Sequence, residues 1–176
     1  TVTTTINTGT DRANAIALQA DGKVVVAGYT RAATNDDFAL VRYNADGSLD
    51  SSFGSGGRVT TPVFVADRAN AVVLQPDGKI VAAGYATSSQ TDVAVVRYTS
   101  GGALDTSFDV DGKITTPLGS GNDTGAAAVL QSNGNVVVAG SSDSGTNLDT
   151  ALVRYNSAGA LDPTFDTDGK VITQAG

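Results

Sequence analysis

The sequence predicts an all-β protein, a β-propeller-like array of three four-stranded antiparallel blades. Three observations support this prediction. The chain of 176 residues repeats itself about every 56 residues, and each repeat contains four short segments with strand-like patterns. No segment combines a helical period with helix-capping residues. Four strands recurring at about 50-residue spacing are typical of a propeller blade.

Two stretches of sequence recur three times in the same order. The first is DRANAIALQADGKVVVAGYT, which returns as DRANAVVLQPDGKIVAAGYA and as DTGAAAVLQSNGNVVVAGSS. The second is DFALVRYNADGSLDSSF, which returns as DVAVVRYTSGGALDTSF and DTALVRYNSAGALDPTF. We therefore assign residues 1–176 to one repeat array, with blades at about 11–61, 67–116 and 123–173.

Each strand of a blade has its own sequence signature. The first alternates alanine with larger residues, a period of two that indicates a strand, and its small side chains suit a crowded inner position. The second is β-branched and almost continuous, as expected for a strand covered on both faces. Asp21-Gly22 between them supplies the positive φ of a tight hairpin turn. In the first repeat we expect the strands at 13–19, 23–29, 38–43 and 58–61, and the fourth recurs at 113–116 and 170–173.

The composition excludes several classes of function. Cysteine and histidine are absent, so disulfides, thiol or imidazole metal sites and the usual nucleophile–base pairs cannot form. All 18 acidic residues are aspartate and the net charge is −7, which disfavours nucleic acid and anionic membrane surfaces. No apolar run approaches ~18 residues, so we expect no membrane insertion. We predict that the chain is not an enzyme and has no bound cofactor.

The two recurring motifs together carry a family resemblance. The motifs LQ.DGK.VVAG and VRYN..G.LD..F occur together and in this order, and this combination resembles the delta-60 repeat family of tandem, propeller-like bacterial repeats. The resemblance covers Asp11 to Thr173, although Gly125, Ala126 and Asn135 depart from the pattern in the third copy. It implies a bacterial, secreted or cell-surface protein, and the sulfur-free composition, rich in Ser, Thr, Gly and Asp, predicts the same extracellular location. It implies no chemistry at named residues.

The repeat count predicts self-association. Propellers close with about four to eight blades, and three do not obviously close a ring. Residues 1–5, TVTTT, match the fourth-strand segment RVTTP, so we expect a leftover fourth strand of a preceding blade there. Unpaired repeat ends leave apolar faces and strand edges open. We therefore expect head-to-tail contact between copies of the chain, in a ring of six blades or a filament, unless the chain is a slice of a longer array.

The connection between the third and fourth strands raises the question of a metal site. It contains Asp109 and Asp111 in the second copy, where the first copy has glycine at both positions. One interpretation is a turn that needs only a flexible backbone, for which Gly and Asp are suited. The other is a weak calcium site, to which Asp105 or Asp162 adds an oxygen. The four candidate calcium ligands are Asp109, Asp111, Asp166 and Asp168.

One arginine recurs inside an apolar strand of every blade, at Arg42, Arg97 and Arg154. We expect structural ion pairs with aspartate, because a partly buried guanidinium favours carboxylate contacts. The sequence leaves two partner sets open: Asp11, Asp67 and Asp123, or Asp50, Asp105 and Asp162. A ring of guanidinium groups that grips an anionic ligand is the alternative.

The remaining recurring residues predict packing rather than chemistry. We expect Phe53, Phe108 and Phe165 in the blade cores. Tyr29 and Tyr85, which the third copy replaces with Ser141, are candidates for carbohydrate stacking. The sequence therefore favours a non-enzymatic structural or adhesive extracellular module that assembles with copies of itself. A propeller module that binds surface glycans or an anionic ligand is the alternative.

Overall fold

The computed structural model describes residues 1–174, which form twelve strands and no helix. No helix long and apolar enough to cross a membrane is therefore found in the described part of the chain. The strands are β1 (Asp11–Leu18), β2 (Val24–Ala32), β3 (Asn35–Tyr43), β4 (Arg58–Thr61), β5 (Ala66–Leu74), β6 (Ile80–Thr87), β7 (Thr91–Tyr98), β8 (Lys113–Thr116), β9 (Asp123–Leu130), β10 (Val136–Asp143), β11 (Leu148–Tyr155) and β12 (Lys170–Thr173).

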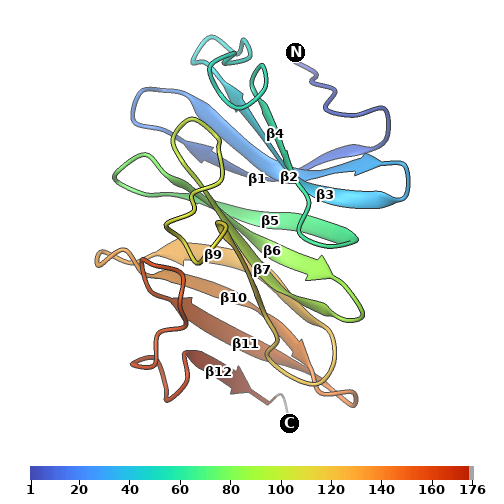
Figure 1. The fold of residues 1–176 in the computed structure, drawn as a ribbon, viewed down its shortest axis with the longest axis vertical. Coiled ribbons are helices and arrows are strands. Elements are labelled where there is room, and N and C mark those ends of the chain that lie inside the picture. Colours follow the sequence, from blue (N-terminus) through green and yellow to red (C-terminus); the bar gives the residue numbers. More distant parts are fainter. Residues whose placement is uncertain (175–176) are drawn as a thin grey trace.

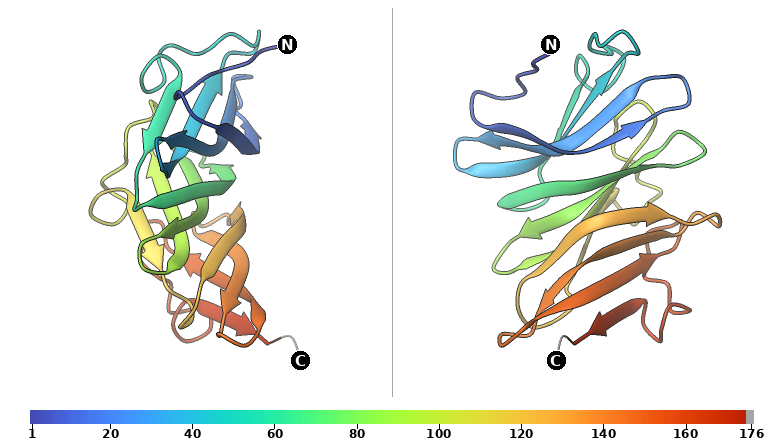
Figure 2. Two further views of the ribbon diagram at one scale, coloured as in Figure 1. Left: turned by 90° about the vertical axis from the view of Figure 1, so that its right-hand side faces the viewer. Right: turned by 180° about the vertical axis from the view of Figure 1, so that it is seen from behind.

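The strands form three antiparallel four-stranded units in chain order, which we call blade 1 (β1–β4), blade 2 (β5–β8) and blade 3 (β9–β12). A single parallel bridge between Asp36 and Ala66 joins blade 1 to blade 2. The blades lie one on another along the long axis of the molecule, with the two chain ends at opposite ends of the array (Figure 1). The predicted all-β, propeller-like class is confirmed, and the three sheets do not close into a ring (Figure 2).

A bulge in the first strand of each blade brings neighbouring blades together. The register shifts at Asn14 in β1 and at Asn70 in β5. The Asn14 side chain then donates to the backbone oxygen of Ala69, and Asn70 donates to that of Gly125, both at 2.8 Å. A β-bulge re-aims the side chain that it displaces. The first strands of consecutive blades therefore lie side by side, as expected if they are the inner strands of the blades.

The glycine opposite each bulge is a steric requirement. Gly28 of β2 pairs with Ala13, and a side chain at Gly28 would collide with the backbone oxygen of Arg12. Gly84 and Gly140 have the same conflict with Arg68 and Thr124. The close approach of the first two strands thus requires the glycine that follows an alanine in the second strand of every blade.

The hydrophobic cores lie between blades, not within them. One cluster combines residues of blade 1 such as Leu40 with residues of blade 2 such as Ile80, and both are fully buried. A second cluster combines Val95 of blade 2 with Val136 of blade 3. A single four-stranded sheet with apolar side chains on both faces can remove them from water only by packing against a neighbouring sheet on each side. The blades therefore depend on each other for their stability.

Residues 1–5 differ from the sequence prediction. We expected a fourth strand of a preceding blade, but this segment pairs with no strand within residues 1–174. A fourth strand needs the third strand of its own blade as a partner, as β4 pairs with β3. The described chain contains no such strand for residues 1–5. The predicted array also includes residues 175–176, which lie outside the described residues.

The inter-blade cores make a prediction about stability. Phe108 is fully buried between blade 2 and blade 3, so Phe108→Ala should lower the free energy of unfolding by about 3–5 kcal/mol. Phe165 holds the equivalent position in blade 3 but is only half-buried, so Phe165→Ala should cost clearly less. Urea unfolding of both variants measures the difference. Equal losses would contradict a core that is shared between blades.

Candidate functional site at the open blade faces

Two of the three recurring arginines, Arg42 and Arg97, each form a latch, by which we mean a set of polar contacts that reaches from their own blade to the next. Arg42 Nε lies 2.7 Å from Asp50 Oδ2, and its Nη1 donates to the backbone oxygen of Ser100 in blade 2 at 2.6 Å. Its guanidinium also lies 4.5 Å from the ring centre of Phe53, a cation–π contact. Charge-assisted bonds of this kind are stronger than neutral ones. Arg42 therefore holds the third-to-fourth strand loop and the neighbouring blade in one arrangement.

The same latch joins blade 2 to blade 3. Arg97 Nε lies 2.7 Å from Asp105, and Nη1 donates to the backbone oxygen of Ser157 at 2.6 Å. Of the two partner sets that the sequence left open, the structure brings the arginines to Asp50, Asp105 and Asp162. Arg42 and Arg97 are fully engaged with protein partners, and an anionic ligand bound by the arginines stays a prediction.

The other aspartate set binds backbone groups at the entrance to the first strands. Asp67 is fully buried, and its Oδ2 accepts hydrogen bonds from the backbone nitrogens of Val63 and Phe64. Asp123 does the same with Leu118 and Gly119 in blade 3. These carboxylates fix the connection from one blade to the next, a role that the sequence did not distinguish from ion pairing.

The acidic loop is a turn with a left-handed residue. Asp109 and Asp166 have φ values of 55° and 53°, and the equivalent Gly54 has φ 54°. Gly and Asp are among the residues that tolerate this conformation. The Asp109 nitrogen donates to the backbone oxygen of Ala158 in blade 3 at 2.7 Å, as Gly54 donates to Gly101. The loop is therefore another contact between blades.

The four candidate calcium ligands form two pairs, one in the acidic loop of blade 2 and one in that of blade 3, and neither pair is joined by a third carboxylate. Asp111 Oδ1 accepts the backbone nitrogen of Lys113, and Asp168 Oδ1 accepts that of Lys170. Asp105, the expected additional ligand, is directed to Arg97. Within residues 1–174 no group of three or more acidic side chains is placed to hold a metal ion. Weak calcium binding by two carboxylates stays a prediction.

The two tyrosine candidates lie in different surroundings. Tyr29 is buried, and the Arg68 guanidinium of blade 2 lies 4.4 Å from its ring centre. Arg68 also binds Asp36 of blade 1, with Nη2 2.6 Å from Oδ2. Tyr29 therefore serves the blade interface and offers no free ring to a sugar. Tyr85 is half-buried, so carbohydrate stacking stays a prediction for that residue alone.

Blade 3 presents one open face, which we call the trailing face and define by Val137, Leu152 and Phe165. The equivalent residues of blades 1 and 2 are buried against the following blade, whereas these three are only partly buried. Arg154 lies 2.9 Å from Asp162 but is 16% exposed, against 7% for Arg42. The described chain supplies no following blade to accept its cross-blade bond.

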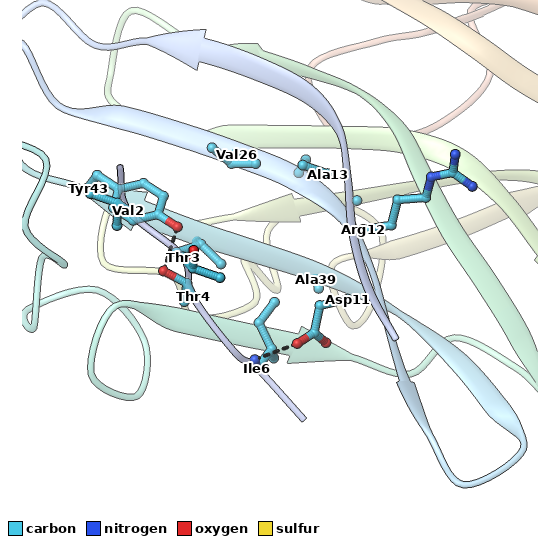
Figure 3. A pocket seen from close by; sticks show the side chains of 13 residues that line it. Val2, Thr3, Thr4, Ile6, Asp11, Arg12, Ala13, Val26, Ala39 and Tyr43 are labelled. Carbon is cyan, nitrogen blue, oxygen red and sulfur yellow. Dashed lines mark hydrogen bonds between the residues drawn. The ribbon is translucent and has the colours of Figure 1, made fainter. Parts of the chain in front are cut away.

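Blade 1 presents the opposite open face, the leading face, defined by Val24, Val26 and Tyr43. Their counterparts in blades 2 and 3 are almost completely buried against the preceding blade. Here they line two neighbouring cavities of about 240 and 340 Å³. Figure 3 shows residues 2–6 crossing the first of these, with Thr4 bonded to Tyr43 and Ile6 bonded to Asp11. The leading face is thus apolar, hollowed and only partly covered.

The carboxylates of the blade interfaces have shifted pKa values in two directions. Burial acts to raise the pKa of Asp105, but hydrogen bonds from Ser107 and Lys79 and the charge of Arg97 lower it to about 2. The pKa of Asp50 is held well below its usual range by Lys23 and other donors.

Aspartates near the start of the first strands have raised pKa values instead. Burial, with the nearby charge of Asp37 as a smaller cause, raises the pKa of Asp67. Burial and the charge of Asp123 likewise raise the pKa of Asp92. Each pair belongs to two neighbouring blades, so like charges meet at the interface. Sequence reasoning missed these pairs, although their regular recurrence in each repeat was a usable signal.

Comparison with protein families agrees with the geometry. The sequence model of a family described as a beta-propeller domain of unknown function (DUF5122) matches residues 19–53, 75–108 and 131–165, more than half of the chain. Each matched stretch runs from the first hairpin of a blade to the phenylalanine beneath its arginine. The narrower resemblance to delta-60 repeats stays a prediction. A search of curated protein sequences finds no match.

The two directions of pKa shift predict a maximum in stability at mildly acidic pH. Raised folded-state pKa values at Asp37, Asp67 and Asp92 mean that protonation as pH falls from neutral stabilises the fold. Depressed values such as that of Asp105 mean that stability is lost as pH falls from ~4 toward 2. Thermal unfolding between pH 7 and 2 measures this profile.

Two matched variants test separately the increase in stability from neutral to mildly acidic pH and the loss of stability at lower pH. Asp67→Asn keeps an oxygen for Val63 and Phe64 and should flatten the increase between neutral and mildly acidic pH. Asp105→Asn should be less stable at pH 7 and should reduce the loss below pH ~4. A profile that neither substitution changes would rule out the interface carboxylates as its cause.

Proposed function

Since the chain belongs to this family of beta-propeller domains of unknown function, we propose that it is a non-enzymatic structural module that self-associates head to tail. In this proposal the trailing face of one copy covers the leading face of another. The observation that carries the proposal is the pair of internal interfaces. Each already buries a trailing face against a leading face of the same repeat sequence.

The two faces retain most of the groups that the internal interfaces use. In a second copy, Ala45 holds the place of Ser100 and Ser157, so its backbone oxygen is the equivalent acceptor for Arg154. The apolar residues of both faces also correspond to buried ones. Covering them would remove apolar surface from water and complete the third latch.

Two contacts of the internal interfaces would be missing between copies. Ala126 replaces the bulge asparagine that joins first strands, so β9 cannot make the bond that Asn14 and Asn70 make. Within the chain, Arg68 of blade 2 binds Asp36 and stacks on Tyr29 of blade 1. Between copies, the equivalent Arg12 would face Leu148 and Ser141 of the other copy, which offer neither a carboxylate nor an aromatic ring. We therefore expect association between copies to be weaker than the packing between blades of one chain, and to depend on concentration.

Two copies joined in this way have six blades, a number that propellers use. If the contact does not close, the same heterologous interface repeats into a filament. In this proposal an array built from such units serves as a scaffold or an adhesive layer. The bacterial, extracellular setting and the delta-60 identity belong to the same proposal and rest on the sequence resemblance.

Sedimentation over a range of protein concentrations tests the proposal. We expect the 17.6 kDa chain to form a dimer or larger species as concentration rises. Leu152→Asp places a charge on the trailing face and should keep the chain monomeric, because an unpaired charge buried in an interface is costly.

Val110→Asp is the matched control, since Val110 is 85% exposed on the middle blade and belongs to neither open face. This variant should associate like the unmodified chain. A chain that stays at 17.6 kDa at every concentration refutes self-association.

A further inference from the structure

We infer that the leading face of blade 1 contains a strand-acceptor socket, built from Tyr43, Arg58 and Asp11, which binds an extended peptide with the pattern of a fourth strand. Residues 2–6 occupy this socket in the present structure. The competing occupant is β12 of a second copy. This inference names the contact that controls the proposed self-association, and it rests on that proposal only for the identity of the second occupant.

The first support is a tyrosine–threonine hydrogen bond that recurs at every blade junction. Tyr98 donates to Thr61 of β4 at 2.9 Å, and Tyr155 donates to Thr116 of β8 at 2.6 Å. Tyr43 donates in the same way to Thr4, at 2.7 Å. Thr4 therefore holds the place of a fourth-strand threonine from a blade that precedes blade 1.

The second support is a Lys or Arg side chain that donates a hydrogen bond to the backbone oxygen of the residue after the threonine. Lys113 Nζ donates to the backbone oxygen of Pro62 at 3.4 Å, and Lys170 Nζ donates to that of Pro117 at 2.8 Å. Arg58 is the equivalent residue of blade 1, and its Nε donates to the backbone oxygen of Thr5 at 3.0 Å.

The third support is the aspartate that begins each first strand. Asp67 Oδ2 accepts the Val63 nitrogen at 2.7 Å, and Asp123 Oδ2 accepts the Leu118 nitrogen at 2.6 Å. Asp11 Oδ2 accepts the nitrogen of Ile6 at 2.8 Å. Three contacts at consecutive positions thus fix residues 4–6 in the register of a fourth strand.

The socket is occupied less tightly than its two counterparts. Thr61 and Thr116 are both 4% exposed and lie in strands that pair with four residues of a neighbour. Thr4 is only half-buried, and Val2 is 58% exposed above the cavity of about 240 Å³. Residues 2–6 pair with no strand of the described chain. A competitor that fills the cavity and brings its own sheet should therefore displace them.

The C-terminal strand has the matching pattern. In β12, Val171 corresponds to Val2 and Thr173 corresponds to Thr4. Thr173 is exposed, so its hydroxyl can accept a hydrogen bond from a tyrosine of another copy. β12 also remains paired with β11, which gives it the rigid sheet that residues 2–6 lack. The socket cannot hold both occupants, so release of residues 2–6 and docking of a second copy are coupled.

A labelled peptide with the sequence of residues 169–174, GKVITQ, tests the socket on the full chain. Fluorescence polarisation should show at least about tenfold tighter binding to the double variant Val2→Asp/Ile6→Asp than to the unmodified chain, because the occupant is weakened. A peptide in which the threonine is replaced by valine should lose most of this gain. The unlabelled peptide TVTTTIN should compete for the same site.

Tyr43→Phe, added to the double variant, supplies the matched control. It removes one hydroxyl without emptying the face and should weaken GKVITQ binding while leaving the valine peptide unaffected. Equal binding of GKVITQ to the unmodified chain and the double variant overturns the inference, as does equal binding of the threonine and valine peptides. Val2→Asp alone repeats the comparison if the double variant does not fold.

The result is separable from the test of self-association. Peptide binding by a chain that never exceeds the mass of a monomer would support the socket and reject the second copy as its occupant. Concentration-dependent association that the double variant does not strengthen would support assembly and reject competition by residues 2–6.

Discussion

Everything in this structure depends on burying the two apolar faces of a four-stranded sheet. A single blade cannot hide both faces, because its side chains alternate from one face to the other along every strand. Leu40 therefore packs against blade 2 and Val136 against blade 2 from the other side, and both hydrophobic clusters lie between blades. The same requirement leaves one apolar face at each end of the array. These two open faces are the surfaces on which the proposed self-association depends.

Polar groups at the interfaces decide how the blades are aligned. Apolar packing alone would tolerate sliding of one sheet over another, whereas Arg42 and Arg97 each bind a loop of their own blade and a backbone oxygen of the next. A directional bond to a fixed carbonyl specifies one register. The carboxylate pairs at the same junctions oppose this stabilisation near neutral pH, because burial and like charge disfavour ionisation. We therefore expect the stability of the interfaces to depend on pH.

The residues that recur in every repeat predicted which side chains take part in the site, but not which partners they contact. The recurrence of one arginine and two aspartates per repeat predicted ion pairing, but the sequence could not choose between Asp11 and Asp50 as the partner of Arg42, since both recur at the same period. Asp109 was ambiguous between a ligand and a turn residue until its φ matched that of Gly54. The expected strand at residues 1–5 was not formed, although those residues keep the hydrogen bonds of one.

The sequence by itself determined the class and the unit of the fold. The period of about 56 residues, the alternating strands and the turn glycines are local properties, and local properties can be read along a chain. Only the tertiary structure decided which contacts join consecutive blades, which residues face the two open ends and which segment occupies the socket beside Tyr43. Those contacts join residues about 40 to 60 positions apart, and sequence spacing fixes no direction for a side chain that must reach another sheet.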